Sequence, residues 1–318
     1  MKAIVQNAYG SPDGLTLAEV SRPTIKDNEV LVRVHAAALN AGDVFALRGS
    51  PWLIRLSVGL FRPKNFVPGW DMAGRVEAVG SRVTRFQPGD EVFGACNGSL
   101  AEFVPTAEDK LAAKPANLTF EQAAAVPTAA VSAMMGLCDV GKIQPGQKVL
   151  VNGASGGVGT FAVQIAKAFG AEVTGVCSTR NVDLVRSIGA GHVVDYTRED
   201  FTQNGQRYDL ILDNVASRSF SDLRRTLTPQ GKIIPNSGHA GMGYVFKAFA
   251  LALVRREHGR MYLAVPNSQN LASLKDIIEA GKVTPVIDKT YPLRETPAAF
   301  RYLVEEHARG KVVITVAE

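Results

Sequence analysis

A glycine-rich stretch in the middle of the chain, residues 153–159 (GASGGVG), constrains the fold more than any other feature. The apolar, β-branched run 148–152 precedes it and is typical of a buried parallel strand. Residues 160–170 follow, with apolar side chains at helical spacing and a glycine at the end. Glycines in such a turn let a phosphate approach the backbone, while free N–H groups of the helix attract the anion. The stretch therefore predicts a dinucleotide site, with a purely structural turn as the alternative.

The next expected strand, residues 171–177, indicates which dinucleotide fits. Sites that prefer NAD usually carry Asp or Glu about twenty residues beyond the glycines, where it binds the ribose 2′-hydroxyl. Ser178, Thr179 and Arg180 occupy this place here. No carboxylate is expected there to repel a 2′-phosphate, and two hydroxyls and a guanidinium can bind one. We therefore expect NADPH; the alternative is a solvated loop whose Arg180 points to water.

Composition favours a soluble, cytoplasmic enzyme of two domains. The chain has 318 residues, 20% of them charged and 46% hydrophobic, an ordinary globular balance. Its net charge of +5 is spread along the sequence, so we expect no nucleic-acid partner. Three distant cysteines argue against a disulfide scaffold, and we expect neither a signal peptide nor a membrane span. Residues 248–254 are the best candidate for a peripheral membrane contact, although a packed or lid helix explains them as well.

The sequence pattern changes character near residue 118. Before that point, short strand-like runs alternate with turns, and from Thr119 onward helices and strands alternate; Thr119 to Gln122 is a candidate capping box. We expect early strands at 30–35, 74–80 and 91–94, later strands at 193–196, 208–213 and 231–234, helices at 181–188 and 220–227, and tail strands at 283–287 and 311–316. This order predicts an α/β fold: a β-rich domain, residues 1–118 and 266–318, and a doubly wound parallel-sheet domain, residues 119–265.

Several motifs along the whole chain resemble those of one known family. They lie at residues 29–34, 39–43, 68–74, 87–94, 154–159 and 310–313. Together they resemble the medium-chain dehydrogenase/reductase superfamily, in its zinc-independent, zeta-crystallin-like quinone oxidoreductase branch. The resemblance implies a GroES-like catalytic domain, a Rossmann domain and an active site in the cleft between them.

The resemblance also bears on metal binding. Zinc alcohol dehydrogenases of the superfamily hold zinc with a Cys, a His-Glu pair and a further Cys or His. In this chain the first Cys position carries Asn40 and the His position carries Trp70, neither of which is a useful zinc ligand. Asp71 keeps a carboxylate but cannot hold the metal alone, and the four-cysteine structural zinc loop is missing. We therefore expect no bound metal.

Without zinc, the resemblance implies reduction of a quinone or an α,β-unsaturated ketone or aldehyde. Asn40 is the candidate catalytic donor to the developing carbonyl oxyanion, the alternative being a residue that fixes the following loop. Asp43 is a second catalytic candidate, better explained as a loop residue. Relatives often carry Tyr where Phe45 stands, so no proton donor is assured. Further tyrosines that could act as the acid are Tyr9, Tyr244 and Tyr262, and water is the remaining source.

Other cofactor contacts carry over by position. In the glycine turn these are Ser155, Gly156, Gly157 and Val158. The resemblance implies that Tyr196 packs beside the 2′-phosphate and that the adenosine ribose passes near Asn214 and Val215. Near the nicotinamide it implies Asn40, Ser132, Ser237, Gly238 and His239. Lys311 falls near the domain junction, where a cofactor contact and a surface position both stay open.

Two other functions stay open. One is an NADPH-binding redox sensor or structural protein with little turnover. The other is a trans-acting enoyl reductase, in which residues 245–254 help to form an acyl groove. The expected partner is a small-molecule quinone or enone, and a homodimer is compatible with the sequence.

Overall fold

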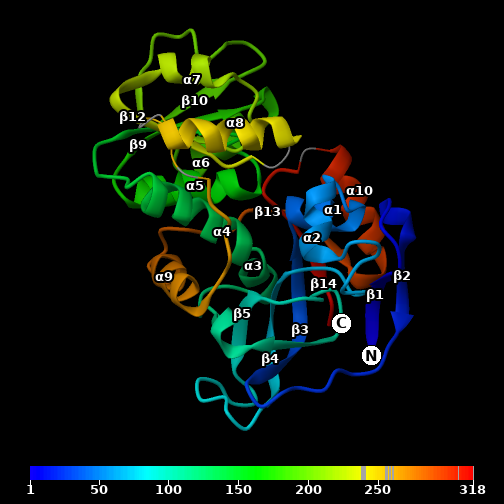
Figure 1. Cartoon of the computed structure of the whole chain (residues 1–318). Coiled ribbons are helices and arrows are strands. Elements are labelled where there is room, and N and C mark those ends of the chain that lie inside the picture. The colour runs from blue at the N-terminus through cyan, green and yellow to red at the C-terminus, as the bar shows by residue number, and fades with distance from the viewer. Residues whose placement is uncertain (238–240, 255–256, 258, 260, 307, 318) are drawn as a thin grey trace. The chain divides into compact units, whose positions relative to one another are not determined.

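The structure is a computed structural model that describes residues 1–237, 241–254, 257, 259, 261–306 and 308–317. It contains two compact units (Figure 1). The first unit comprises residues 1–131, 265–280 and 285–318, and the second comprises residues 132–264 and 281–284. Each unit has its own sheet and its own apolar core.

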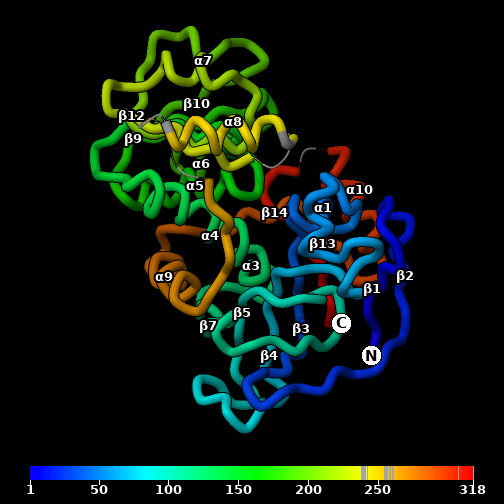
Figure 2. Tube along the Cα trace, viewed as in Figure 1, coloured from blue at the N-terminus to red at the C-terminus, as the bar shows by residue number. Residues whose placement is uncertain are grey.

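The first unit is built on a mostly antiparallel sheet, as the alternation of short apolar runs predicts. Its order is β13-β14-β3-β4-β5-β7, with β6 paired to β3. The strands are β3 (Glu29–Leu39), β4 (Asp71–Val79), β5 (Glu91–Ala95), β6 (Phe103–Ala107), β7 (Leu111–Ala113), β13 (Ile287–Pro292) and β14 (Lys311–Thr315). A separate hairpin joins β1 (Lys2–Gln6) to β2 (Leu15–Glu19), which lie side by side in Figure 2. The β-rich, GroES-like character of this part of the chain is confirmed.

The tail returns to the first sheet as expected, because β14 pairs antiparallel with β3, Val312 lying opposite Leu39. The strand expected at 283–287 is wrong: β13 begins only at Ile287. The backbone of Thr284 is used elsewhere, since its N–H donates to Gln164 Oε1 and its carbonyl accepts from Gln164 Nε2. Pro285, which has no N–H, cannot extend a ladder at this point either.

Helices of the first unit are α1 (Ala41–Arg48), α2 (Arg55–Val58), α3 (Phe120–Ala124), α9 (Ser268–Glu279) and α10 (Thr296–Glu305), and α4 (Pro127–Met134) passes into the second unit. The predicted capping box is present: Thr119 Oγ1 accepts from Gln122 N at 3.2 Å, and Gln122 Oε1 accepts from Thr119 N at 3.0 Å. Because α3 packs on β3 and β4, the first unit extends to Val131, whereas the pattern placed a boundary after residue 118.

The second unit is a five-stranded, wholly parallel sheet of order β10-β9-β8-β11-β12. Its elements are β8 (Lys148–Asn152), α5 (Gly157–Ala168), β9 (Glu172–Cys177), α6 (Val182–Ser187), β10 (His192–Asp195), β11 (Tyr208–Asp213), α7 (Phe220–Arg225), β12 (Leu227–Pro235) and α8 (Gly241–Val254). The strand order reverses between β8 and β11. In doubly wound folds ligands bind at this reversal, outside the carboxyl ends of the strands.

Helix α8 contains the segment singled out as a candidate lid or membrane contact. Ala248 is fully buried and Tyr244 and Leu251 pack on the core of the second unit, so one side of α8 is a packed face. Phe246 and Phe249 on the other side are exposed. Within the described part of the chain, no helix is both long enough and apolar enough to cross a membrane.

Gly159 provides a test of how closely α5 packs on the turn before it. A Cβ at this position would lie 2.0 Å from the carbonyl oxygen of Gly153 and 2.8 Å from backbone atoms of Ala154. We expect Gly159→Ala to lower the free energy of unfolding by about 1–3 kcal/mol, because backbone must move to accept the methyl group. Gly243→Ala is the control, since its Cβ would meet open space. Urea unfolding without cofactor measures both, and equal stability of the two variants contradicts this packing.

Candidate active site and nucleotide site

The turn after β8 has the three glycine positions that a dinucleotide site needs. Gly153 has a φ of +77°, in the left-handed region that favours glycine. Gly156 is the N-cap of α5, and a Cβ there would meet only the Gly153 carbonyl, at 3.5 Å, so the space in front of it is open. Gly159 allows the close packing described above. Ser155 and Val158 are half-exposed in the same turn, so the N-terminus of α5 can receive an anion.

The residues expected around the 2′-phosphate lie together at the ends of β9 and β10. Ser178 follows β9, and Tyr196 is held beside it because Tyr196 N donates to the carbonyl of Cys177 at 3.0 Å. Asn181 was missed by the sequence analysis. Its Nδ2 donates to Ser155 Oγ at 3.0 Å and to Ser178 Oγ at 3.2 Å, so it links the glycine turn to this loop. Asparagine at the start of a short helix is common, which is why the pattern gave no signal.

A carboxylate also stands at this corner, contrary to expectation. Asp195, the last residue of β10, pairs with Cys177 in the parallel register and accepts a hydrogen bond from the Thr179 hydroxyl. That hydrogen bond, followed by bonds from Thr197 and the charge of Arg198, holds the pKa of Asp195 below its usual range. Spacing along the chain could not reveal this neighbour, because it arrives from the adjacent strand. Arg198, 3.4 Å away, partly balances the charge.

Polar side chains form a continuous line across the carboxyl ends of β8, β11 and β12. Ser132 Oγ donates to Asn236 Oδ1 at 3.1 Å, and Asn236 Nδ2 donates to Asn214 Oδ1 at 2.7 Å. Asn214 Nδ2 then donates to the Asn152 carbonyl at 3.0 Å, and Asn152 Nδ2 donates to Asp213 at 2.8 Å. This line lies at the reversal of strand order. It brings together the predicted residues Ser132 and Asn214 within the second unit.

Ser237 supports the assignment of a ligand to this edge of the sheet. It is 3% exposed, and its Oγ has no hydrogen-bond partner among the described residues. A buried hydroxyl without a partner is costly, so a ligand group is the natural complement. Val215 is exposed next to Asn214. Gly238 and His239 lie outside the described residues. The open glycine turn and this hydroxyl fit a nicotinamide dinucleotide.

The three tyrosines considered as proton donors are already engaged. Tyr9 donates to the carbonyl of Gly59, Tyr244 donates to Asp213 at 3.2 Å, and Tyr262 donates to the carbonyl of Ser132 at 2.9 Å. Burial raises the pKa of each phenol, and the Asp213 charge raises that of Tyr244 further. Such phenols are poor acids, so their main contribution is to packing and positioning.

In the first unit, Lys311 is the centre of a buried polar cluster. Its side chain is 2% exposed, and its ammonium donates to the Leu39 carbonyl at 3.0 Å and to Asn40 Oδ1. Asn40 Nδ2 donates to Asp71 Oδ2 at 2.9 Å, and the Asn40 backbone N–H donates to Asp43 at 2.8 Å. Asp71 also accepts from the backbone N–H and the hydroxyl of Thr128. The surface position that stayed open for Lys311 is therefore excluded.

Charges in this cluster are out of contact with water. Burial and the nearby Asp71 charge raise the pKa of Asp43 to about 7. Burial also raises the pKa of Asp71, although Lys311 and Thr128 oppose this effect. Burial lowers the pKa of Lys311, against the attraction of both carboxylates. With Asp43 protonated, the Lys311 ammonium and the Asp71 carboxylate balance each other, 3.9 Å apart.

The residues around the cluster bear on metal binding. Trp70 lies against Gly42, where a Cβ would be 2.5 Å from the indole ring. Burial and the charges of Asp71 and Asp43 raise the pKa of the Cys96 thiol well above its usual range, so it stays a thiol. Nowhere in the described ranges do three or more His, Cys, Asp or Glu side chains gather in a way that could hold a metal ion.

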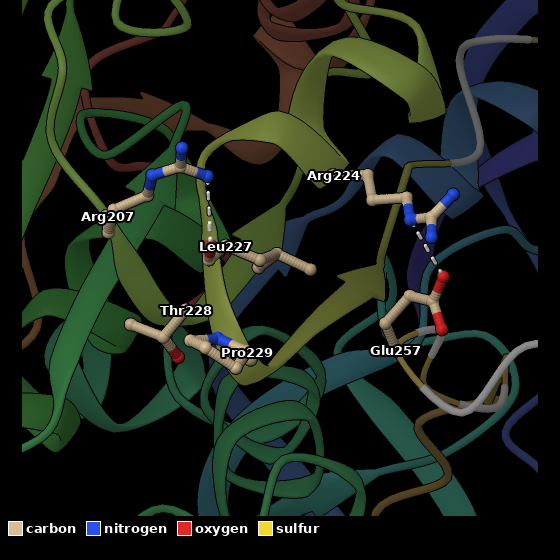
Figure 3. A pocket seen from close by; sticks show the side chains of 7 residues that line it. Arg207, Arg224, Leu227, Thr228, Pro229 and Glu257 are labelled. Carbon is tan, nitrogen blue, oxygen red and sulfur yellow. Dashed lines mark hydrogen bonds and ion pairs between the residues drawn. The ribbon is translucent and has the colours of Figure 1, made fainter.

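A hollow of about 570 Å³ lies elsewhere in the second unit, at the amino ends of β11 and β12 (Figure 3). Arg224 faces Glu257 across 3.1 Å, and Arg207 donates to the Leu227 carbonyl. Because doubly wound sheets bind ligands at the carboxyl ends of their strands, this hollow is not the nucleotide site.

Two known protein families match separate parts of the chain. The family described as alcohol dehydrogenase GroES-like domain matches residues 26–133, and the family described as zinc-binding dehydrogenase matches residues 188–314. The NAD(P)H oxidoreductase RTN4IP1, mitochondrial, of Danio rerio is 33% identical over 100% of this chain and 92% of its own length. The chain belongs to the medium-chain dehydrogenase/reductase superfamily, in its quinone oxidoreductase-like branch.

Two further members agree with this assignment. The chloroplastic NADPH-dependent alkenal/one oxidoreductase of Arabidopsis thaliana is 35% identical, over 99% of this chain and 79% of its own length. The solved structure of the quinone oxidoreductase from Coxiella burnetii has a TM-score of 0.87 and 29% identity, covering 100% of this chain and 99% of that chain. The chain is therefore an oxidoreductase that uses a nicotinamide cofactor.

The raised pKa of Asp43 predicts how stability depends on pH. The folded state retains a proton on Asp43 up to about pH 7, whereas the unfolded chain loses it near 3.8. The folded state thus binds more protons between these values, so this group makes the free energy of unfolding fall as pH rises from about 4 to 7. We expect Asp43→Asn to remove a slope of up to about 1.4 kcal/mol per pH unit in that window.

Urea unfolding at intervals between pH 4.5 and 7.5, for wild type and variant, measures the difference. Asp90→Asn is the control, a carboxylate that caps an exposed turn. Parallel wild-type and Asp43→Asn profiles would show that Asp43 is ionised throughout this range.

Proposed function

We propose that the protein is a zinc-independent, NADPH-dependent reductase of a conjugated carbonyl, either a quinone or an α,β-unsaturated ketone or aldehyde. The observation that carries the proposal is the fixed carboxamide of Asn40, held between an ammonium and a carboxylate. The names of the quinone oxidoreductase and alkenal/one oxidoreductase relatives support the substrate class.

The partners of Asn40 fix its orientation. An ammonium can only donate and an ionised carboxylate can only accept, so Oδ1 faces Lys311 and Nδ2 faces Asp71. Nδ2 carries two N–H groups, and Asp71 accepts one of them. Asn40 is half-buried, and its second N–H is the group that we expect to face a ligand. A prealigned neutral donor of this kind stabilises negative charge that develops on a carbonyl oxygen.

The same cluster gives the protein a way to act without zinc. When bound, a reduced nicotinamide supplies the hydride, and conjugation makes the acceptor carbon electron-poor without a metal. Lys311 and Asp71 act as positioning residues for Asn40. Asp43 holds the first turn of α1 through the Asn40 N–H, which agrees with a loop role for that residue. The engaged tyrosines leave water as the source of the final proton.

The preference for NADPH rests on Ser178, Thr179 and Arg180, opposed by Asp195. The Ser178 hydroxyl and the Arg180 guanidinium can each make charge-assisted hydrogen bonds to a 2′-phosphate, whereas the single proton of the Thr179 hydroxyl is donated to Asp195. Asp195 repels the same phosphate, and its partners Thr179 and Arg198 reduce that repulsion. We expect the attraction to prevail.

The reaction is tested by a screen of NADPH oxidation with quinones, alkenals, enones and saturated ketones. Conjugated acceptors should react, and saturated ketones should be poor acceptors, because no metal polarises an isolated carbonyl. We expect Asn40→Ala to lower kcat by about a hundredfold while the Kd for NADPH changes little, since the donor acts on the developing charge.

Asn117→Ala is the control, because Asn117 bonds the Ile278 carbonyl away from the cluster. Unchanged kcat in Asn40→Ala would return Asn40 to a structural role. A cofactor-binding protein without turnover on any acceptor would instead be the redox-sensor protein of the alternative hypothesis.

Cofactor choice is tested by titrating NADPH and NADH into wild type and single variants. We expect NADPH to bind about 10- to 100-fold more tightly than NADH. Arg180→Ala should weaken NADPH alone, and Ser178→Asp should reverse much of the preference. Asp195→Asn should strengthen NADPH without affecting NADH, because it removes a charge and keeps an acceptor for Thr179. Equal wild-type affinities, or an Arg180→Ala variant that loses both cofactors alike, would contradict the assignment.

A further inference from the structure

An exposed apolar surface in the first unit lies outside the buried polar cluster of Asn40, Asp71 and Lys311. It follows α1 and includes α2 (Figure 1). We call it the 52–66 surface, and it consists of Trp52, Leu53, Leu56, Leu60, Phe61 and Phe66 with the basic residues Arg62 and Lys64. Phe61 is 89% exposed, Leu56 67% and Trp52 60%. Large apolar side chains so exposed and so close in sequence indicate an interaction surface.

The backbone beneath this surface is held in place. Arg55 donates to the Gly49 carbonyl at 2.9 Å and lies over the ring of Tyr9, whose hydroxyl donates to the Gly59 carbonyl. Lys64 N donates to the Val58 carbonyl and Gln6 N donates to the Phe66 carbonyl, both at 2.6 Å. The apolar side chains are therefore presented outward by a fixed segment.

The charge of this segment favours an anionic partner for the 52–66 surface. Between residues 44 and 70 the sequence has four basic residues, Arg48, Arg55, Arg62 and Lys64, and no acidic residue. Arg62 and Lys64 are exposed beside Phe61 and Phe66. Basic side chains interleaved with Trp, Phe and Leu match a bilayer whose headgroups are anionic and whose boundary accepts aromatic rings.

We propose that the 52–66 surface docks the protein on an anionic lipid bilayer. Trp52, Leu56 and Phe61 enter the boundary between headgroups and acyl chains, and Arg62 and Lys64 bind the lipid phosphates. The contact is peripheral, because the segment is a short helix and a turn. A bilayer contact requires no second protein, and it predicts that binding falls with added salt.

Sedimentation with vesicles tests the proposal on the full chain. We expect binding to vesicles of phosphatidylcholine with phosphatidylglycerol, and little binding to phosphatidylcholine alone. Leu56→Gln/Phe61→Ser and, separately, Arg62→Glu/Lys64→Glu should each weaken binding by at least about tenfold, which is about 1.4 kcal/mol.

Two matched control variants test whether binding depends on the 52–66 surface itself or on any loss of exposed rings or positive charge. Phe246→Ser/Phe249→Ser removes two similarly exposed rings from α8, and Lys26→Glu/Arg82→Glu makes the same charge change elsewhere in the first unit. Both should bind vesicles as wild type does. If the α8 variant loses binding instead, the membrane contact lies on α8 and the proposal is wrong.

Fluorescence adds a readout that does not depend on folding of the double variants. In Trp70→Phe, Trp52 is the only tryptophan of the chain. Its emission should shift to the blue on anionic vesicles and be quenched by brominated phosphatidylcholine included in them. The absence of quenching overturns the proposal. So does concentration-dependent self-association that the 52–66 variants abolish while vesicles bind nothing, because the occupant is then a second copy.

Discussion

The buried ammonium of Lys311 is the interaction on which the first unit depends. Through one side chain it joins the start of β14 to the end of β3 and, through Asn40, to the N-terminus of α1 and the start of β4. An isolated charge at this buried position would be strongly unfavourable. The Lys311 ammonium and the Asp71 carboxylate are therefore stable in their charged forms only because each has the other nearby. The same contacts that satisfy the charge also hold the carboxamide that the proposed chemistry requires.

The second unit has a glycine turn, residues 153–159, that contains no cationic side chain with which to bind the pyrophosphate of a dinucleotide. It offers backbone N–H groups at the start of α5 and a row of amides at the ends of the parallel strands, which we propose as the cofactor contacts. Neutral donors of this kind are indifferent to pH, whereas the cluster around Lys311 titrates. The two halves of the proposed chemistry therefore respond differently to solution conditions.

Local features of the sequence predicted most of the fold. The apolar runs at 148–152, 171–177 and 208–213 became β8, β9 and β11, and the Thr119 capping box starts α3, because these signals are contained in a few neighbouring residues. Long-range neighbours escaped prediction. Asp195 reaches Thr179 through the register of two parallel strands, and Lys311 meets Asn40 across 271 residues of chain. The composition of each segment does not show which distant side chain it will face. The charges around both sites could therefore be identified only from the folded structure.

The first unit is assembled from three separate segments of the chain, which affects how it folds during synthesis. Residues 1–131 emerge from the ribosome first, yet β3 lacks its neighbour β14 until the intervening second unit has been made. Until then residues 36–39 of β3 lack a partner on one edge, although β6 already pairs with residues 29–33, and the Asp71 carboxylate has no ammonium to balance it. The nearly continuous second unit can complete its core earlier. During synthesis the second unit can therefore fold before the first unit is complete. Until β14 and Lys311 have been synthesised, the early strands of the first unit must be protected from aggregation.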